Sequence, residues 1–419
     1  MNIPEQMAAQ QAYFQTGATL EISFRRNALH TLKKGLIKHE TSLLEALCAD
    51  LGKSSFEAYL TELSLVRGAI DETISALTRW TRPRRVPTPL SHFPGNSRVL
   101  RDPYGLVAIL APWNYPLQLC LLPLVGILAA GNCAVVKPSK DAPHTAQAIG
   151  ALLKSCFEPE YVSFFTGNRE VNQEILHGPC DLIFFTGSPA VGREVMRAAA
   201  ERLTPVVLEL GGKSPCIVLE DADVALAARR IAWAKLLNAG QTCVAPDYVL
   251  VSRKLEKPLL EALASQMRVM FGENPRENPE FPHIVNVRHF QRLMGLMSGG
   301  RIVTGGRGEE DTLHIAPTVL TDVLPDAPVM QEEIFGPILP VLPFDTLQDA
   351  LAKVRARPLP LACYLFTRNV RAGREILRTL RFGSGCINDC VMQLANPHLP
   401  FGGVGESGMG CYHAAFPYA

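Results

Sequence analysis

Apolar positions along the chain follow two different periods, and the change of period divides the chain. Within residues 1–80 they recur every three or four positions, as in LLEALCADLG (43–52) and YLTELSLVRGAIDETISAL (59–77). This spacing predicts amphipathic helices. The segment 81–96 then carries Pro83, Pro87, Pro89 and Pro94, which break a helix. We therefore expect a linker that runs into an extended excursion.

From residue 105 onward, short apolar runs alternate with helical patterns. Strands are expected at 105–110, 133–139, 162–167, 181–187 and 205–210, with helices between them, one of them over 123–131. Strands that are apolar on both faces and alternate with helices are typical of a doubly wound parallel sheet. Ligands bind such sheets at the carboxyl ends of the strands, where the turns APWNYP, KPSK, FTGN, FTGS and ELGG fall. The spacing in GSPAVG (187–192) is not the GxGxxG dinucleotide fingerprint, so the pattern alone leaves the ligand open.

The same alternation restarts after Gly212. Strands are expected at 214–221, 248–252, 301–306 and 317–323, and helices at 222–240 and 257–271. The predicted fold is therefore α/β, with a doubly wound parallel-sheet domain followed by a second α/β domain. We place the first domain at 1–85 and 105–209 and the second at 210–398. Residues 86–104 and 399–419 are expected to be extended segments outside both.

Composition and charge narrow the class of partner. The 419 residues are 47% hydrophobic and 19% charged with a net charge of +1, which is ordinary for a soluble globular enzyme and favours neither nucleic acid nor an anionic membrane as partner. The uncharged stretch from Pro103 to Val136 is long enough for a membrane span, but several prolines and glycines interrupt it. A buried strand, loop, helix and strand explain it better.

The cysteines indicate a reducing compartment and no metal site. There are eleven of them, an odd number, with no CxxC pair and no histidine pair at zinc-ligand spacing. The N-terminus lacks a basic start followed by an apolar run, which is the pattern of a signal peptide. We therefore expect a cytoplasmic protein.

Candidate chemistry lies in three polar segments. Cys243 stands in NAGQTCVAPDY between a helix and a strand, where Gly, Gln and Pro favour a turn that a substrate can reach. Glu209 ends an apolar strand in VVLELGGKSP, and Asn114 lies between two prolines in APWNYP. Taken one at a time, a buried small residue, a solvated carboxylate and an Asx-turn residue are the ordinary interpretations.

Several motifs in a fixed order carry more information than these single residues. They are PWNYP (112–116), KPS (137–139), FTGS (185–188), ELGGKSP (209–215), GQTCVAPDY (240–248), EEIFGP (332–337) and PFGGVGESGMG (400–410). With these motifs the chain resembles the aldehyde dehydrogenase superfamily from about residue 24 to 409. The short N-terminus and the wording GQTCVAPDYVL look like its class 3 branch.

The resemblance implies oxidation of aldehydes to carboxylic acids with NAD(P)+. Cys243 would be the nucleophile, and its thiolate would form a thiohemiacetal and then a thioester. Asn114 and the backbone N–H of Cys243 would stabilise the oxyanion. Glu209 would activate the hydrolytic water, so we expect partial burial to raise its pKa.

The resemblance also implies residues for the cofactor and the aldehyde. The residues expected near the dinucleotide are Trp113, Lys137, Lys140, Thr186, Gly187, Ser188, Gly192, Glu333 and Phe335. Those expected to line the aldehyde pocket are Tyr115, Leu119, Trp233 and Phe401, and this aromatic lining favours aromatic or medium-to-long-chain aliphatic aldehydes. Core packing is the simpler interpretation for Leu119. The first domain would bind the cofactor, the second would carry the catalytic cysteine, and the extended segments would join two subunits of a homodimer.

Two departures from the resemblance change the expectations. Members that prefer NAD often have Glu at the position of Lys140; a lysine can pair with a 2′-phosphate, so we expect NADP to be used at least as well as NAD. The chain ends at FPYA, whereas class 3 relatives usually continue and often pair there with the partner subunit, so the dimer is less firmly implied than the catalysis. Three alternatives remain: a decayed binding or scaffold protein, a cofactor-free thiol esterase, and a CoA-acylating dehydrogenase.

Overall fold

The computed structural model describes residues 2–272 and 274–412. Its N-terminal part is helical, as the three-to-four periodicity predicts. The helices are α1 (Ile3–Gln15), α2 (Ile22–Lys38), α3 (Glu40–Leu51), α4 (Ser55–Ala58) and α5 (Ser64–Trp80), with a π-helical turn over Tyr59–Leu63. Their apolar faces pack on the first sheet in one hydrophobic core.

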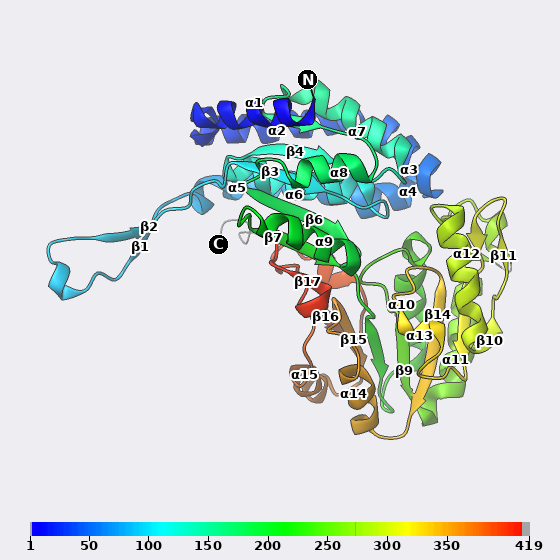
Figure 1. Ribbon diagram of the computed structural model, residues 1–419. Helices are drawn as coiled ribbons and strands as arrows, with labels where there is room; N and C mark the ends of the chain where they lie inside the picture. The colour runs from blue at the N-terminus through cyan, green and yellow to red at the C-terminus, as the bar shows by residue number, and fades with distance from the viewer. Residues whose placement is uncertain (1, 273, 413–419) are drawn as a thin grey trace.

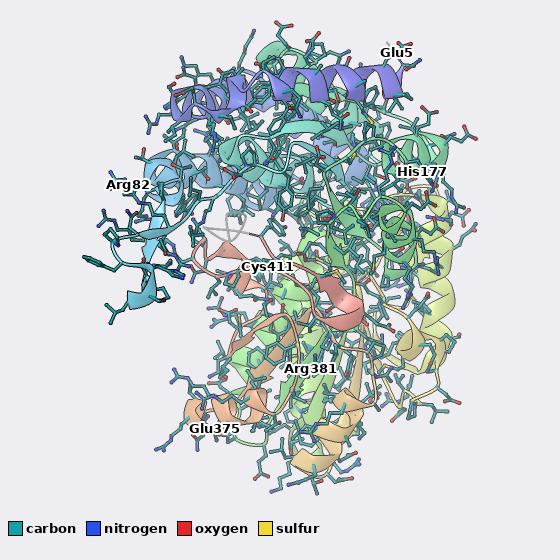
Figure 2. The ribbon with its side chains drawn as sticks, turned by 60° about the vertical axis from the view of Figure 1, so that its left-hand side comes forward. Glu5, Arg82, His177, Glu375, Arg381 and Cys411 are labelled. Carbon is teal, nitrogen blue, oxygen red and sulfur yellow. The ribbon has the colours of Figure 1, made fainter. Side chains whose placement is uncertain are left out.

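The proline-rich segment forms a hairpin that projects from the body of the molecule (Figure 1). Its strands β1 (Arg84–Val86) and β2 (Ser97–Val99) pair antiparallel. At its tip the side chains of Leu90 and Phe93 are 93% and 83% exposed, which is unusual for residues of this size. In Figure 2 the labelled Arg82 marks the base of this hairpin.

The first sheet has the order β17-β7-β6-β3-β4-β5. Its parallel strands are β3 (Leu106–Leu110), β4 (Cys133–Lys137), β5 (Val162–Phe164), β6 (Leu182–Gly187) and β7 (Val206–Leu210). The helices α6 (Pro116–Ala130), α7 (Pro143–Cys156), α8 (Arg169–Leu176) and α9 (Pro189–Ala200) connect them. The strand order reverses between β3 and β6, the place where doubly wound sheets bind ligands. The predicted alternation is confirmed, although α6 begins at Pro116, earlier than the expected helix at 123–131.

The second sheet has the order β10-β13-β14-β9-β8-β15-β16. Its strands are β8 (Pro215–Val218), β9 (Tyr248–Ser252), β10 (Arg301–Thr304), β13 (Thr318–Thr321), β14 (Ile338–Phe344), β15 (Ala362–Phe366) and β16 (Ser384–Ile387), and only β10 runs antiparallel to its neighbour. The associated helices are α10 (Val224–Leu236), α11 (Glu256–Phe271), α12 (Val287–Leu296), α13 (Pro328–Gln331), α14 (Leu347–Arg355) and α15 (Val370–Arg378). A small ribbon, β11 (Gly308–Glu309) with β12 (His314–Ile315), lies beside α12 (Figure 1).

The two sheets form separate layers that the last described segment joins. Strand β17 (Gly408–Met409) pairs antiparallel with β7, so the chain returns from the second layer to the edge of the first. Cys411, labelled in Figure 2, follows this strand and lies between the layers. No helix formed by the described residues combines the length and the apolar character needed to cross a bilayer.

Candidate active site

Cys243 stands at the end of a turn with unusual backbone geometry. The sequence predicts a helix over 222–240, but α10 ends at Leu236, because Asn238, Ala239 and Gly240 all have positive φ, at 53°, 51° and 75°. A side chain at Gly240 would collide with the carbonyl of Gly336, so only glycine fits this position. Such conformations persist only where surrounding contacts impose them.

Long-range hydrogen bonds fix this turn. The side-chain amide of Gln241 donates to His283 O at 3.0 Å, and its Oε1 accepts from Val285 N at 3.0 Å. The hydroxyl of Tyr364 donates to Val244 O at 2.6 Å. Cys243 therefore lies in a rigid turn, which agrees with the sequence-based expectation of a turn at this place.

The environment of the Cys243 sulfur disfavours the thiolate. The residue is half-buried. Burial raises the pKa of its thiol to about 12, and the nearby carboxyls of Glu333 and Glu209 add to this shift. The backbone N–H groups of Cys243 and Val244 lower the pKa in part, because they face the sulfur. A base or an added positive charge is therefore needed to form the thiolate at neutral pH.

Glu209 is a buried carboxyl with no hydrogen-bond partner. It lies near the end of β7, opposite Thr186 on β6 and Gly408 on β17, and is 3% exposed. Neither side-chain oxygen has a partner among the described residues. Burial raises the pKa of this carboxyl well above its ordinary value, as expected from the sequence. A buried acceptor without a partner costs stability, which indicates a use for it.

Asn114 lies against the cysteine turn. Its Nδ2 donates to Gln241 O at 3.0 Å, two residues before Cys243 in the chain. An amide nitrogen carries two hydrogens, so this bond leaves one for another acceptor. The folded chain thus brings together the sulfur, the carboxyl and the amide that lie far apart in the sequence.

A second group of predicted residues gathers around Glu333, whose carboxyl is near enough to affect the Cys243 thiol. Glu333 is half-buried as a residue, burial of its carboxyl raises its pKa to about 8, and its buried Oε1 has no partner among the described residues. A side chain at Gly211 would collide with this carboxyl, so the glycine permits the close approach. Phe335 has φ 52° and meets the ring of Trp113 edge-on, with ring centroids 5.3 Å apart.

His289 belongs to the same group, although sequence reasoning missed it. Its ring lies 5.1 Å from that of Trp113, and burial together with Arg292 and Arg288 lowers its pKa to about 4. The imidazole is therefore neutral. A lone histidine on α12 belongs to none of the motifs, so nothing in the sequence marked it. Arg292, one turn further along, donates to the carbonyls of Glu333 and Ile334 and holds that segment.

The remaining cofactor candidates lie at the carboxyl ends of β4 and β6. Lys137 ends β4, and burial lowers its pKa. Thr186 has a buried hydroxyl without a partner among the described residues. Ser188 follows Gly187 and caps α9 by accepting from Val191 N at 3.5 Å. Gly192 faces Leu210, where an added Cβ would lie 2.7 Å from the leucine side chain, so its position is one of close helix–strand packing.

A cavity of about 580 Å³ opens beside these strand ends. It is lined by residues after β4, by α7 and by the turn after β5, including the exposed Lys140 and also Lys154, Phe164 and Gly167. Two lysines thus face one hollow next to the predicted dinucleotide site. No group of three or more His, Cys, Asp or Glu side chains within 2–272 and 274–412 is arranged to hold a metal ion.

The predicted aldehyde-pocket residues are mostly buried. Tyr115, Leu119 and Phe401 are 7%, 7% and 6% exposed, and Trp233 is half-buried. The Tyr115 hydroxyl lies 2.6 Å from Thr242 Oγ1, next to Cys243. The ring of Phe401 meets that of Tyr412, with centroids 5.8 Å apart.

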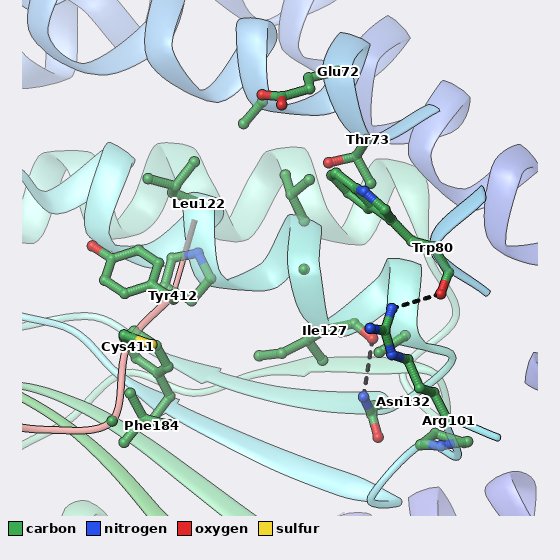
Figure 3. Close-up of a pocket in the computed structure, with 18 of the residues that line it drawn as sticks. Glu72, Thr73, Trp80, Arg101, Leu122, Ile127, Asn132, Phe184, Cys411 and Tyr412 are labelled. Atoms are coloured by element: carbon green, nitrogen blue, oxygen red, sulfur yellow. Dashed lines mark hydrogen bonds between the residues drawn. The ribbon is translucent and has the colours of Figure 1, made fainter. Parts of the chain in front are cut away.

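Another cavity, of about 1200 Å³, is lined by none of these four residues. It runs along α5, α6 and the start of β6 and β7, and Figure 3 shows Leu122 and Ile127 of α6 facing Phe184 and Tyr412 across it. Tyr412 marks the end of the cavity that is nearest to Glu209 and Cys243. Burial raises the pKa of its hydroxyl, and both of these groups are near enough to raise it further. Arg101, which donates to Trp80 O at 2.8 Å, marks the opposite end at the hairpin base.

Comparison with known proteins agrees with this arrangement. The family model described as "Aldehyde dehydrogenase family" matches residues 2–418. The 4,4'-diaponeurosporen-aldehyde dehydrogenase of Staphylococcus aureus is 46% identical, with 100% of this chain and 92% of that protein aligned. Aldehyde dehydrogenase family 3 member B3 of Mus musculus is 42% identical over 97% of this chain and 85% of its own length. A solved structure titled as the substrate-bound state of Staphylococcus aureus AldH superposes with a TM-score of 0.98 at 45% identity, covering 100% of this chain and 92% of that one.

The fold, the meeting of Cys243, Glu209 and Asn114, and the match over nearly the whole length all point the same way. The resemblance to class 3 enzymes is confirmed by family 3 relatives among the matches. The chain belongs to the aldehyde dehydrogenase family.

Proposed function

We propose that this chain oxidises aromatic or medium-to-long-chain aliphatic aldehydes to carboxylic acids with NAD(P)+, through a thioester on Cys243. The observation that carries the proposal is the pair of groups around the sulfur. The Glu209 carboxyl, which has no hydrogen-bond partner in the described part of the chain, lies close enough to raise the thiol pKa, and the Asn114 amide bonds to the residue two positions before the same cysteine. Hydrolytic thioester chemistry needs a base and an oxyanion donor at such positions.

In the first half-reaction Cys243 is the nucleophile. Ionised Glu209 accepts the thiol proton, and the sulfur forms a bond to the aldehyde carbon. Negative charge develops on the former carbonyl oxygen, where the free hydrogen of Asn114 Nδ2 and the Cys243 backbone N–H stabilise it. A nicotinamide held beside Cys243 would accept the hydride that leaves the former aldehyde carbon, and the carbon–oxygen double bond would re-form as a thioester.

In the second half-reaction Glu209 acts on water. Before this step the carboxyl releases to solvent the proton that it took from the thiol. Its carboxylate then accepts a proton from the attacking water as the water oxygen bonds to the thioester carbon, and the same two donors stabilise the oxyanion. The carbon–sulfur bond then breaks, the carboxylic acid leaves, and Cys243 is restored. A pKa raised toward the working pH makes Glu209 a stronger base than an exposed glutamate.

The polar groups left unpaired on the cofactor side fit a dinucleotide. Glu333 Oε1 and Thr186 Oγ1 are both buried and have no partner in the part of the chain that the structure describes. Hydroxyls of a ribose or oxygens of a phosphate can supply the missing hydrogen-bond partners. Glu333 with Phe335 and Trp113 would hold the nicotinamide end, Lys137 the adenosine ribose, and Thr186, Gly187 and Ser188 the phosphates at the start of α9. Gly192 would let α9 approach the sheet closely.

We propose that NADP is used at least as well as NAD. Lys140 and Lys154 both line the cavity beside β4, so a 2′-phosphate there would meet two positive charges. A carboxylate that could accept a bond from the NAD 2′-hydroxyl does not stand at position 140.

The remaining proposals concern substrate, partner and compartment. Tyr115, Leu119, Trp233 and Phe401 would line the aldehyde pocket, since Tyr115 bonds to Thr242 beside the nucleophile. The exposed Leu90 and Phe93 at the hairpin tip support a homodimer joined through residues 86–104. All eleven cysteines are free thiols, which favours a reducing compartment such as the cytoplasm.

The test measures acid and reduced nicotinamide from benzaldehyde, hexanal, decanal and a hydroxycinnamaldehyde with each cofactor. We expect equimolar acid and NAD(P)H without added CoA, with decanal and the aromatic aldehydes preferred over hexanal. A folded protein that binds NAD(P) but turns over no aldehyde would identify a decayed scaffold. Ester cleavage without nicotinamide reduction would identify a thiol esterase, and a requirement for CoA would identify an acylating enzyme.

A further inference from the structure

A lysine that no motif contains lies fully buried beneath the loop of Asn114. Lys53 follows the left-handed Gly52 at the end of α3 and precedes Ser54, which caps α4. Its side chain is 0% exposed, and Nζ donates to Glu62 Oε1 at 2.6 Å and to Asn114 O at 3.0 Å. The ammonium also lies 4.0 Å from the centroid of the Tyr115 ring. These three contacts hold the end of the side chain in one place.

Glu62 extends the contact to the other end of the same loop. It lies in the π-helical turn before α5, and such turns are frequent at functional sites. Its Oε2 accepts from the backbone N–H groups of Leu117 and Gln118 at 2.9 and 3.1 Å. These are donors of the first turn of α6 that no helical carbonyl can satisfy. The ion pair therefore holds Asn114 and the start of the helix that follows it.

The carbonyl of Asn114 receives a second donor from the cysteine turn. Asn238 Nδ2 donates to it at 2.7 Å and to Gln241 O at 3.2 Å, while Asn238 N donates to Glu57 Oε1 at 2.6 Å. The Asn114 carbonyl is thus the point where the N-terminal helices and the cysteine turn meet. A shift of this carbonyl also moves Asn114 Nδ2, because both belong to one residue.

Buried ion pairs contribute little to stability, since the cost of removing both charges from water offsets most of their attraction. Well-packed apolar side chains at the same positions often give a protein that is equally stable. An ion pair whose two members bond to a catalytic loop at three points is better explained by the position it imposes. Resting on the proposed function, we propose that Lys53, paired with Glu62, is a positioning residue that places the Asn114 amide at the oxyanion next to Cys243.

The test uses Lys53→Met together with Glu62→Gln in the full-length enzyme. The double variant removes both charges, so no unpaired ion is left in the core, and the amide introduced by Glu62→Gln keeps an oxygen for the N–H groups of α6. Misplacement of an oxyanion donor lowers transition-state binding, so we expect kcat and kcat/KM for the aldehyde to fall together by about 10- to 100-fold. The Kd for NADH and the KM for the aldehyde should stay within about twofold, because neither depends on a group that acts only in the transition state.

A double-mutant cycle separates positioning from general damage. In an Asn114→Ala background the same pair of substitutions should lower the rate by less than about twofold, since the group through which Lys53 acts is already gone. The matched control is Lys33→Met, which removes another lysine ion pair, with Asp71 on α5, and should leave the rate unchanged. Where the paired variant does not fold, Lys53→Arg keeps the charge opposite Glu62 and enters the same cycle with a smaller expected loss.

Two results overturn the inference. One is a folded Lys53→Met/Glu62→Gln enzyme with parental kcat, and the other is a loss that persists in full in the Asn114→Ala background. An unmodified chain that oxidises no aldehyde overturns the proposed function itself and, with it, the assigned role of Lys53.

Discussion

The two sides of the candidate active site differ in how their polar atoms are satisfied. On the reacting side, both oxygens of Glu209 and one of Glu333 are buried without hydrogen-bond partners within residues 2–272 and 274–412, and the pKa of the Cys243 thiol is raised to about 12. On the supporting side, Lys53 and Glu62 are fully buried, yet both carboxylate oxygens and the ammonium have partners within hydrogen-bond distance. Ionisable groups are buried on both sides, but those of the supporting side are hydrogen-bonded, whereas the oxygens of Glu209 have no partner among the described residues.

This difference separates groups that must react from groups that must hold position. An unpartnered buried acid is costly and therefore ready to bind water, proton or ligand. A fully bonded buried ion pair resists displacement and keeps its neighbours in place. Proteins accept lower stability at such reacting groups, because activity depends on them.

The largest effect is expected from the nucleophile. Cys243→Ser should lower aldehyde-dependent NAD(P)H formation by at least about 10⁴-fold, since loss of a central nucleophile removes the covalent route. Stopped-flow and steady-state absorbance measure it. Cys48→Ser, an exposed thiol on α3, is the matched control and should behave as the parent. A Cys243→Ser enzyme with the parental rate would contradict the covalent mechanism.

The second effect concerns the base. Glu209→Gln should lower steady-state kcat by roughly 10²- to 10⁴-fold, because general-base assistance to water is lost. If the thiol can still ionise, a burst of up to one equivalent of NAD(P)H should precede the slow phase, and mass spectrometry should detect the acyl group on Cys243. A variant with normal turnover would place the hydrolytic base elsewhere.

The third effect is on stability, and it tests directly whether the buried Glu209 carboxyl differs from the hydrogen-bonded Lys53–Glu62 pair. Burial raises the pKa of Glu209 in the folded state, so the folded chain holds this proton more tightly than the unfolded chain. The contribution of this proton binding to the free energy of unfolding is therefore fully present below the pKa that Glu209 has in the unfolded chain. It is lost as pH rises through the pKa that Glu209 has in the folded chain. Relative to Glu209→Gln, the parent should lose up to about 1.4 kcal/mol of unfolding free energy per pH unit within that window. Denaturant unfolding of both proteins at pH 5, 6, 7 and 8 measures it, and parallel curves would show that the carboxyl ionises normally.

The smallest effect is on cofactor choice. Lys140→Glu should lower kcat/KM for NADP by roughly fivefold to tenfold, as expected for the loss of one exposed charge contact of about 1 kcal/mol together with new repulsion. The value for NAD should stay the same or rise. Lys34→Glu makes the same charge change on α2, outside the cavity beside β4, and should alter neither value. Equal changes for both cofactors would show that residue 140 does not contact the 2′ position.

The local pattern of apolar and polar residues predicts much of the architecture. The period of apolar residues predicts the N-terminal helices and the alternation in both sheets, because strands buried on both faces must be apolar throughout. It misses the start of α6 at Pro116 and the end of α10 at Leu236. The second miss has a clear cause. Contacts with Gly336, His283 and Asn114 hold residues 238–240 in left-handed conformations that no helical periodicity reports.

By itself the sequence determined the α/β class, the loops at the strand ends and the motifs that mark Cys243, Glu209 and Asn114. Only the tertiary structure decided that the Glu209 carboxyl has no hydrogen-bond partner among the described residues, that His289 packs against Trp113, and that Lys53 bonds to Asn114 across 61 positions of chain. Local pattern records which face of an element is apolar. Hydrogen-bond satisfaction of a buried group depends on neighbours from distant segments, and those are set only when both layers and the turns between them are packed together.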